Sequence, residues 1–577
     1  MFLLSLLLTV GCFGASDTPP TPSGPQGPFA VFFSLDGPMP QFSNPAELLG
    51  KPAMSQHRFD KIIKKAALDF KVQEVVVHIG SPQVSLARAS EIVEILRQVT
   101  KAGKSLVCHM DSADNIGYWI ASSACPKLLL SPAGEVSALG LALEPVFIRE
   151  LLATLGISAE MLHVGAYKDA ADALTRDSMS DESRTAATEM LAELHNVLVA
   201  GISTSRKLDA AKVRSIIDNG PYSASEAKKL GLVDEILPLQ SYLETLIATY
   251  QGGVVDDYGK PPVKQLSITD LMKLFGDASK DEKAPTAPRI ALVPIMGPIV
   301  GGQNEDNLMG GQESVHDISL TATLGELARD ATVKAVVLRI DSPGGSALAS
   351  DNIWHAVRHL ASKKPVVASM GDVAASGGYY IASAAQEVFA TPATLTGSIG
   401  VVGGKMVFRE AAEKIGVRTE RLQTGKRAGL FSPFTVFDEE ERKLVTKMMQ
   451  EAYHLFVDRV ATGRNLPREK VLAVAEGRVW TGSQALSHGL INHIGGLTAA
   501  IARVRVLASL PAGVEVDIMP KPKSLMELMG EAFSEPEARV AHALAKQHPA
   551  VGLGLTLTTL LRKEQVLAIA PYTISAR

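Results

Sequence analysis

The chain has 577 residues, of which 46% are hydrophobic and 20% are charged, and its formal net charge is −4. This composition is typical of a globular protein large enough for several domains, and it excludes an intrinsically disordered chain. The 57 basic and 61 acidic residues are intermixed. Such a balance gives no reason to expect nucleic acid as a partner.

The cysteine and histidine patterns argue against a metal site. Cys12, Cys108 and Cys125 show neither a CxxC pair nor a His-rich ligand spacing, so we expect no zinc site and no disulfide framework. His355 and His359 stand four residues apart in a helical pattern. No acidic motif accompanies them, which favours an exposed helix face over a metal site. We therefore predict no cofactor.

The N-terminus predicts an exported protein held near a membrane. Residues 1–14, MFLLSLLLTVGCFG, are apolar, but a membrane-spanning helix needs about 20 residues. The run matches the apolar core of a secretion signal, although no basic residues precede it. Cys12 after Thr-Val-Gly resembles a bacterial lipoprotein cleavage site, with Thr9 where leucine is usual. An uncleaved signal anchor is the alternative, and residues 15–28 read as a Pro/Ser/Gly linker.

The chain contains an internal duplication. Four pairs of segments match in the same order: EVVVHIGSP with AVVLRIDSP (74–82 and 335–343), GYWIAS with GYYIAS (117–122 and 378–383), LGISAEMLHVG with IGVRTERLQTG (155–165 and 415–425), and YSASEAKKLGLVDEI with WTGSQALSHGLINHI (222–236 and 480–494). The separation drifts only from 261 to 258 positions, which indicates a duplicated domain. We predict two homologous halves at 29–250 and 289–520, a polar linker at 251–288 and a tail at 521–577.

Within each half, short β-branched runs alternate with helical patterns. The second half predicts strands at 289–297, 335–343 and 365–370, an amphipathic helix at 349–363, and a long helix at 437–463 that begins with acidic residues. Strand, helix and strand in succession require crossover connections. The sequence therefore predicts an α/β fold with mostly parallel sheets covered by helices.

The segment DVAASGGYYIA (372–382) places Ser376 between small residues, which would leave its side chain accessible. The same pattern also suits a tight packing contact. Asp372 is the acidic residue close to it in sequence. A serine nucleophile needs a base, and comparison of the two halves indicates where one lies.

The two halves retain complementary residues. Ser376 aligns with Asn115, so only the second half has the hydroxyl. Gly344 and Gly345 align with Gln83 and Val84, and a glycine-rich strand end can aim backbone N–H groups at a developing oxyanion.

The first half in turn has Lys168 where the second has Ala428. Burial can lower a lysine pKa from about 10.4 by up to ~3–5 units, and a neutral amine can take a proton from serine. Lys168 is therefore the predicted base for Ser376, contributed by the other half.

Together, SPGGS, AASGGYYIA, TLTGSIGV and GAYKDAADALTRDSMS resemble the long, duplicated form of signal peptide peptidase A. That family comprises membrane-associated bacterial serine–lysine proteases, and the resemblance implies two tandem domains of the Clp-protease/crotonase-like fold. It also implies residue roles: Ser376 as nucleophile, Lys168 as general base, Ser398 as the hydroxyl that orients the lysine, and the N–H groups of Gly345, Gly377 and, less directly, Gly344 as the oxyanion hole.

The resemblance further implies a homotetramer that degrades cleaved signal peptides in the cell envelope, with its catalytic domains on the extracytoplasmic side. Ser398 also has a structural alternative, because Ser137 keeps the hydroxyl in the first half.

Other functions stay open from sequence. A crotonase-like acyl-CoA enzyme would share the sheet and the glycines, but it would need neither a serine nucleophile nor export. A Clp-type Ser-His-Asp peptidase would need a histidine after Ser376, and no later histidine aligns with the lysine position. A catalytically inactive envelope scaffold is the third alternative. Residues 301–314 are expected to form a mobile rim over the cleft, and the apolar segment 550–561 to serve packing or subunit contact.

Overall fold

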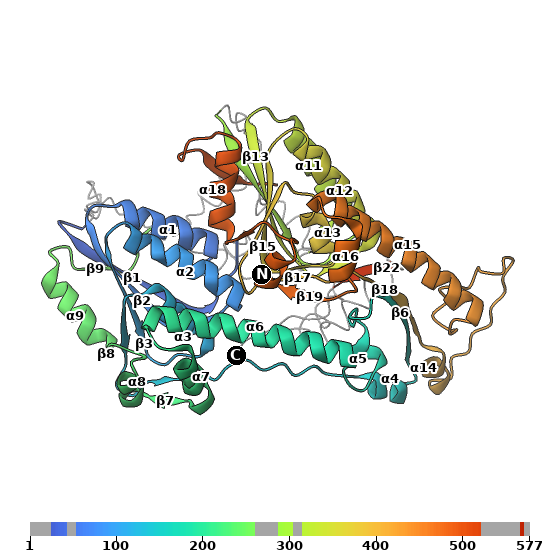
Figure 1. The fold of residues 1–577 in the computed structure, drawn as a ribbon, viewed down its shortest axis with the longest axis horizontal. Helices are drawn as coiled ribbons and strands as arrows, with labels where there is room; N and C mark the ends of the chain where they lie inside the picture. Colours follow the sequence, from blue (N-terminus) through green and yellow to red (C-terminus); the bar gives the residue numbers. More distant parts are fainter. Residues whose placement is uncertain (1–24, 43–53, 260–286, 304–313, 521–565, 570–577) are drawn as a thin grey trace, which may run out of the picture.

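The computed structural model describes residues 25–42, 54–259, 287–303, 314–520 and 566–569 (Figure 1). The predicted signal segment, most of the predicted rim and the apolar segment 550–561 lie outside these ranges. Within them, no helix has both the length and the apolar character needed to cross a membrane.

The first half forms a parallel sheet of six strands. From edge to edge these are β8 (Glu235–Ile236), β4 (Lys127–Leu130), β3 (Ser105–Met110), β2 (Val72–Gln83), β1 (Phe29–Pro38) and β9 (Val254–Val255). Alternate residues of β2 face opposite sides, as a pleated strand requires: Val75 and Val77 pack in the main core and Val76 in a second, smaller core. The sheet is therefore buried on both faces.

Helices cover both faces of this sheet. One face packs against α1 (Gln56–Leu68), α2 (Leu86–Lys101) and α3 (Asn115–Ala124), and the other against α9 (Leu239–Thr249). A long helix, α6 (Asp181–Arg206), packs on α3 and is followed by α7 (Ala210–Asn219), β7 (Tyr222–Ser223), which pairs with β5 (Glu135–Val136), and α8 (Ala224–Leu230).

The second half repeats this plan around a sheet of eight strands. Its main path runs β19 (Val479–Thr481), β17 (Leu395–Gly397), β15 (Val366–Ala375), β13 (Val333–Ser342), β10 (Arg289–Met296) and β21 (Glu515–Ile518). Off this path, β16 (Glu387–Ala390) pairs with β15, and β20 (His493–Ile494) pairs with β16. All its pairings are parallel except that of β17 with β19. The predicted α/β fold with mostly parallel sheets is confirmed.

The helices of the second half occupy equivalent places. They are α11 (Asp317–Arg329), α12 (Ala347–Ala361), α13 (Gly377–Ala382), α15 (Glu439–Arg464), α16 (Arg468–Val474), α17 (Gly482–Ser487) and, on the opposite face, α18 (Leu497–Leu507). The long helix predicted at 437–463 is α15. It is capped by Asp438, whose side chain accepts a hydrogen bond from the N–H of Glu441, and three glutamates in its first turn suit the helix dipole.

A third sheet joins the two halves. Its order is β12 (Val315–His316), β11 (Ile299–Val300), β14 (Gly344–Ser346), β22 (Val566–Ile569), β18 (Val401–Val407) and β6 (Ser158–Val164). The strand β6 belongs to the first half and pairs antiparallel with β18 along its whole length. Near β6 and β18 lie the short helices α4 (Arg149–Leu155), α5 (Asp172–Thr175) and α14 (Arg409–Lys414) (Figure 1).

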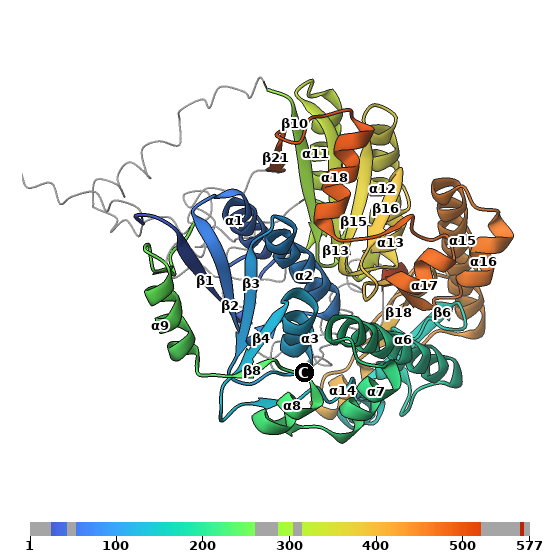
Figure 2. The ribbon, with the colours of Figure 1, turned by 60° about the vertical axis from the view of Figure 1, so that its left-hand side comes forward.

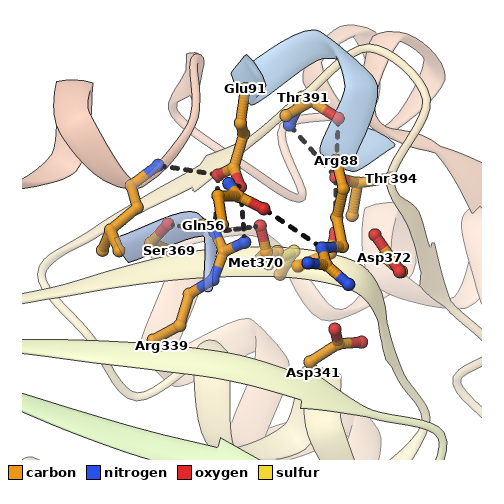
Figure 3. A network of polar contacts seen from close by, with 12 residues as sticks. Gln56, Arg88, Glu91, Arg339, Asp341, Ser369, Met370, Asp372, Thr391 and Thr394 are labelled. Carbon is orange, nitrogen blue, oxygen red and sulfur yellow. Dashed lines mark hydrogen bonds and ion pairs between the residues drawn. The ribbon is translucent and has the colours of Figure 1, made fainter. Parts of the chain in front are cut away.

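A buried ion pair also connects the halves. In Figure 2, α2 of the first half lies between the two main sheets. Its Glu91 receives two hydrogen bonds of 2.7 Å from the guanidinium of Arg339 on β13, and both side chains are almost fully buried (Figure 3). Arg339 also donates to Ser369 Oγ and Met370 O at 2.9 Å, and Glu91 accepts from the N–H of Leu497 at 2.8 Å. The buried charges are thus paired and hydrogen-bonded, as buried ions must be.

The expectation of no disulfide was wrong. Cys108 and Cys125 form a disulfide with an Sγ–Sγ distance of 2.06 Å. Cys108 lies on β3 and Cys125 follows the last residue of α3, so the strand–helix crossover brings their Cα atoms to 5.7 Å. Their separation of 17 residues matches no short motif, which is why spacing alone did not reveal the pair.

We predict that Glu91→Ala lowers the free energy of unfolding by about 3–5 kcal/mol, because it leaves the Arg339 guanidinium buried without a counter-charge. Denaturant unfolding of the variant and the parent protein measures this loss. Glu387→Ala is the matched control. Glu387 makes a similar paired contact with Arg503, but within one half and partly exposed, so its loss should cost roughly 0–1 kcal/mol. Equal losses in the two variants would contradict a special role for the buried pair.

Candidate active site

Ser376 lies in a tight turn between a strand and a helix. β15 ends at Ala375 and α13 begins at Gly377, so Ser376 stands immediately before a helix. Its backbone has φ 54° and ψ −116°, an uncommon conformation for a residue with a side chain. Hydrogen bonds from Ser376 N to Gly397 O and from Tyr380 N to Ser376 O, both 2.8 Å, hold the turn.

The second glycine after the serine, Gly378, allows close packing. A Cβ on Gly378 would lie 2.6 Å from the carbonyl oxygen of Ser342, which explains why this position has no side chain. Ser376 itself is fully buried, so the expectation of an accessible side chain was wrong. The turn is thus over-determined by its surroundings, a condition under which strained backbone persists at functional sites.

Lys168 reaches this serine from the other half. It follows β6, is 1% exposed, and places its Nζ 2.8 Å from Ser376 Oγ, 3.0 Å from Ser398 Oγ and 3.1 Å from Ser398 O. Burial lowers its pKa to about 7, while the nearby Asp169 carboxylate acts in the opposite direction. The amine is therefore neutral in a large fraction of molecules near neutral pH.

Lys168 Nζ is the donor in all three contacts, and a neutral amine can keep the two to Ser398. The carbonyl oxygen of Ser398 can only accept, so Lys168 donates one N–H to it. A second N–H can go to Ser398 Oγ, which leaves the nitrogen lone pair facing the hydroxyl of Ser376. Ser398 is fully buried, has φ 51°, and is held by a 2.7 Å hydrogen bond from its N–H to Arg478 O.

In the first half, the position that corresponds to Ser376 is occupied by Asn115, whose side chain is bonded to the backbone. Asn115 donates from Nδ2 to Gly140 O at 2.8 Å and accepts from Gly140 N at 3.0 Å, so a backbone segment uses the amide. Ser137, the counterpart of Ser398, donates to the side chain of Glu135 at 2.8 Å.

The glycine strand β14 leads toward the same site. Gly345 has φ 156°, and a Cβ there would lie 2.0 Å from Ile299 O, so no side chain fits. Gly344 has φ 98°, and its N–H donates to Ser342 Oγ at 3.1 Å. Because that N–H is already used within the protein, Gly345 is the better candidate for binding an oxyanion.

Asp372 contacts the other half through a different hydroxyl. Its Oδ1 accepts from Ser85 Oγ at 2.5 Å. Burial and the neighbouring Asp341 carboxylate raise its pKa to about 7, against the opposing effects of Arg88 and Arg339 (Figure 3). Asp372 therefore belongs to the junction between the halves.

The histidines that sequence left open make other contacts. His454 lies 3.0 Å from Arg468 and His493 2.9 Å from Glu387, whereas the ring of His488 packs on Trp480. His355 contacts Arg459 and Asp351. Across the described part of the chain, no three His, Cys, Asp or Glu side chains are grouped so as to hold a metal.

Two features next to the site were missed by sequence reasoning. One is the turn at Glu476 and Gly477, whose Glu-Gly dipeptide could have signalled left-handed backbone. The other is β22, which lies between β14 and β18. Its apolar residues could have predicted a strand, but no local pattern indicates which strands it pairs with.

Lys168 should make the stability of the protein rise with pH. The folded-state pKa is about 7 and that of an unfolded lysine about 10.4, so between these values the unfolded chain binds more protons. Raising the pH from 7 to 10.5 should therefore stabilise the parent, relative to Lys168→Met, by on the order of 4 kcal/mol. Denaturant unfolding at a series of pH values measures the difference, and parallel curves for the two proteins would contradict the buried neutral amine.

The similarity to a known protein family also falls into two regions. The model of peptidase family S49 matches residues 98–248 and 358–511, one region in each half. The chain is 33% identical over 458 residues to "Serine protease SPPA, chloroplastic" of Arabidopsis thaliana, covering 79% of this chain and 66% of that protein. It is 30% identical over 467 residues to "Protease 4" of Salmonella typhi, covering 79% and 71%.

"Protease 4" of Haemophilus influenzae is 30% identical over 420 residues, covering 71% of this chain and 65% of that protein. The chain thus spans about two thirds of the length of these curated relatives. Among solved structures, a point mutant of ClpP1 from Listeria monocytogenes is 15% identical to the chain and covers 36% of it, with 94% of the ClpP1 chain aligned. The TM-score is 0.24, so this likeness carries no argument. The two matched regions and the extent of the aligned relatives establish that the chain belongs to peptidase family S49.

Proposed function

We propose that the chain is a serine endopeptidase in which Ser376 is the nucleophile and Lys168 the general base. The observation that carries this proposal is the 2.8 Å contact between Lys168 Nζ and Ser376 Oγ, made between the halves and buried from solvent. A serine that only packs and a lysine that belongs to the surface would not form such a buried contact, because burying an amine is unfavourable unless the fold compensates for it.

The proposed reaction has two stages, formation of an ester on Ser376 and its hydrolysis, and Lys168 transfers the proton in both. Neutral Lys168 takes the proton of Ser376 as Oγ attacks the carbonyl carbon of the peptide bond. The N–H groups of Gly345 and Gly377 bind the oxygen as its negative charge develops. The lysine ammonium then protonates the departing amine, which leaves an ester on Ser376. Water, deprotonated by the same lysine, hydrolyses this ester, and Ser398 keeps the amine oriented throughout.

We place the substrate as an extended strand between β14 and β18. The chain's own β22 supports this location: it pairs antiparallel with Gly344–Ser346 on one side and with Val402 and Gly403 on the other. Leu567 on β22 is fully buried in an apolar cluster with Ala170, Ala171, Leu174, Val300, Val402 and Met406. A groove that holds a strand by its backbone and encloses an aliphatic side chain suits apolar peptides.

Signal peptides released from exported proteins are peptides of this kind, and we propose them as substrates. Residues 1–14 would keep the enzyme near the membrane of a bacterial cell envelope, as a lipid-modified or uncleaved N-terminus, with the catalytic domains on the extracytoplasmic side. A homotetramer is the proposed assembly, on the basis of the family resemblance. The acyl-CoA enzyme and the inactive scaffold predict no Ser376-dependent peptide cleavage, so one assay distinguishes the peptidase from both.

We expect purified protein to hydrolyse an apolar signal-like peptide, and Ser376→Ala and Lys168→Ala each to lower kcat/KM by at least about 10³-fold while the fold is kept. Activity of the parent should rise with pH to half its maximum near pH 7, because the base must be neutral. Lys104→Ala is the control, since that lysine is partly buried in the same half but donates to Ala66 O. Unchanged turnover in Ser376→Ala would exclude the nucleophile assignment.

We also expect removal of residues 566–577 to lower KM for the peptide several-fold with little change in kcat, because β22 and substrate would compete for one groove. Steady-state kinetics on the truncated and full-length proteins measures the effect. Leu567→Ala should act in the same direction but less strongly, since it weakens the docking of β22 without removing it. A higher KM after truncation would mean that β22 supports the groove rather than occupies it.

A further inference from the structure

The turn at Ala475–Arg478 connects α16 to β19 and runs through left-handed backbone. Glu476 has φ 55° and Gly477 has φ 78°. A glutamate in this region is uncommon, because its Cβ crowds the backbone. Such a conformation persists only where neighbouring contacts hold it. Those neighbours include the loop that bears Lys168.

Glu476 holds this loop by main chain and side chain. Its carbonyl oxygen accepts from the N–H of Tyr167 at 2.8 Å, and its Oε2 accepts from the N–H of Ala166 at 3.1 Å. The hydroxyl of Tyr453 on α15 donates to Oε1 at 3.1 Å, which fixes the carboxylate from the other side. The residues just before Lys168 are therefore tied to the serine-bearing half.

Gly477 supplies the surface on which the lysine rests. A Cβ on Gly477 would lie 2.6 Å from the Cβ of Lys168 and 2.7 Å from its Cα and N. Gly165 is equally close in the other direction, since a Cβ there would lie 2.6 Å from the carbonyl carbon of Glu476. The two backbones can approach this closely only because both positions are glycine.

The same turn also positions the partner of the lysine. Gly477 N donates to Ile399 O at 2.8 Å, and Arg478 O accepts from Ser398 N at 2.7 Å. The amine and the serine that receives its two hydrogen bonds are thus both anchored to one short turn. A displacement of the turn would change the contacts of Lys168 on both sides.

We propose that Glu476 and Gly477 are positioning residues that seat Lys168 against Ser376 and Ser398 and keep water from its amine. This inference rests on the proposed role of Lys168 as the base. Neither residue touches the reacting atoms, and both act through the position of the lysine. If the contact between the turn and Lys168 is loosened, water reaches the amine and the pKa of Lys168 rises toward that of an ordinary lysine.

Gly477→Ala tests the seat, with Gly489→Ala as its matched control. Both glycines have left-handed φ, 78° and 73°, so both substitutions strain the backbone alike. A Cβ on Gly489 would meet only Leu466 at ordinary contact distance, whereas one on Gly477 meets Lys168. The readouts on full-length protein are the pH profile of kcat/KM for the apolar peptide and trace acetylation of Lys168 by acetic anhydride against pH, followed by mass spectrometry.

For Gly477→Ala we expect kcat at pH 7 to fall at least ten-fold with KM changed less than three-fold, and both pH midpoints to rise by at least one unit. Gly489→Ala should leave both midpoints in place. If Gly477→Ala is folded and its midpoints match those of the parent, the proposal is wrong. If the parent cleaves no peptide, the proposed function fails, yet the acetylation midpoint still decides whether the turn seats the lysine.

A second pair of variants covers the case in which Gly477→Ala does not fold. Glu476→Gly keeps the left-handed backbone but removes the carboxylate, so we expect a two- to five-fold loss of kcat and an upward shift of the acetylation midpoint. Glu476→Gln retains an acceptor oxygen for Ala166 and should restore both values. Equal midpoints in Glu476→Gly and the parent, with Gly477→Ala unfolded, would also overturn the proposal.

Discussion

Burial of the Lys168 amine at the junction of the two halves is the constraint on which the rest of the structure depends, because burying an amine costs free energy. Water must be kept out of that junction, and several contacts across it do so. The strand β6 pairs with β18 just before the lysine, and the Arg339–Glu91 ion pair closes the interface farther away. Because the low pKa of Lys168 comes from burial, anything that opens the junction raises it. The stability of the interface therefore sets the pKa of Lys168, and with it the fraction of the amine that is neutral.

Duplication explains how such a site is built. Both halves are built on a mostly parallel sheet covered by helices, of six strands in the first and eight in the second. The first half has Asn115 in place of the serine and bonds it to Gly140, while the second has Ala428 where the first has Lys168. The candidate site thus takes its residues from both halves.

Much of the fold and the residues of the candidate site could be predicted from sequence. Strand and helix patterns are local, and the loss of a hydroxyl or an amine at aligned positions can be read directly from the repeats, as Ser376 and Lys168 show. Contacts between distant segments could not. The Cys108–Cys125 disulfide, the pairing of β6 with β18 and the insertion of β22 depend on how finished elements meet in space, and no periodicity records that. The role of Gly477 was hidden for the same reason, because a glycine reveals nothing of what lies against it.

Backbone strain is concentrated around the lysine. Among the described residues, six with side chains have positive φ. Lys207 and Asn465 end the long helices α6 and α15, an ordinary place for such a conformation. Ser376 and Ser398, by contrast, contact Lys168 directly, and Glu476 holds the loop before it. Ser376 and Ser398 meet at the amine, whereas Glu476 is bonded to the backbone N–H groups of Ala166 and Tyr167. Since each is tied to the others through Lys168 or the Ala475–Arg478 turn, moving one must move the rest, and the geometry of the site is kept as a unit.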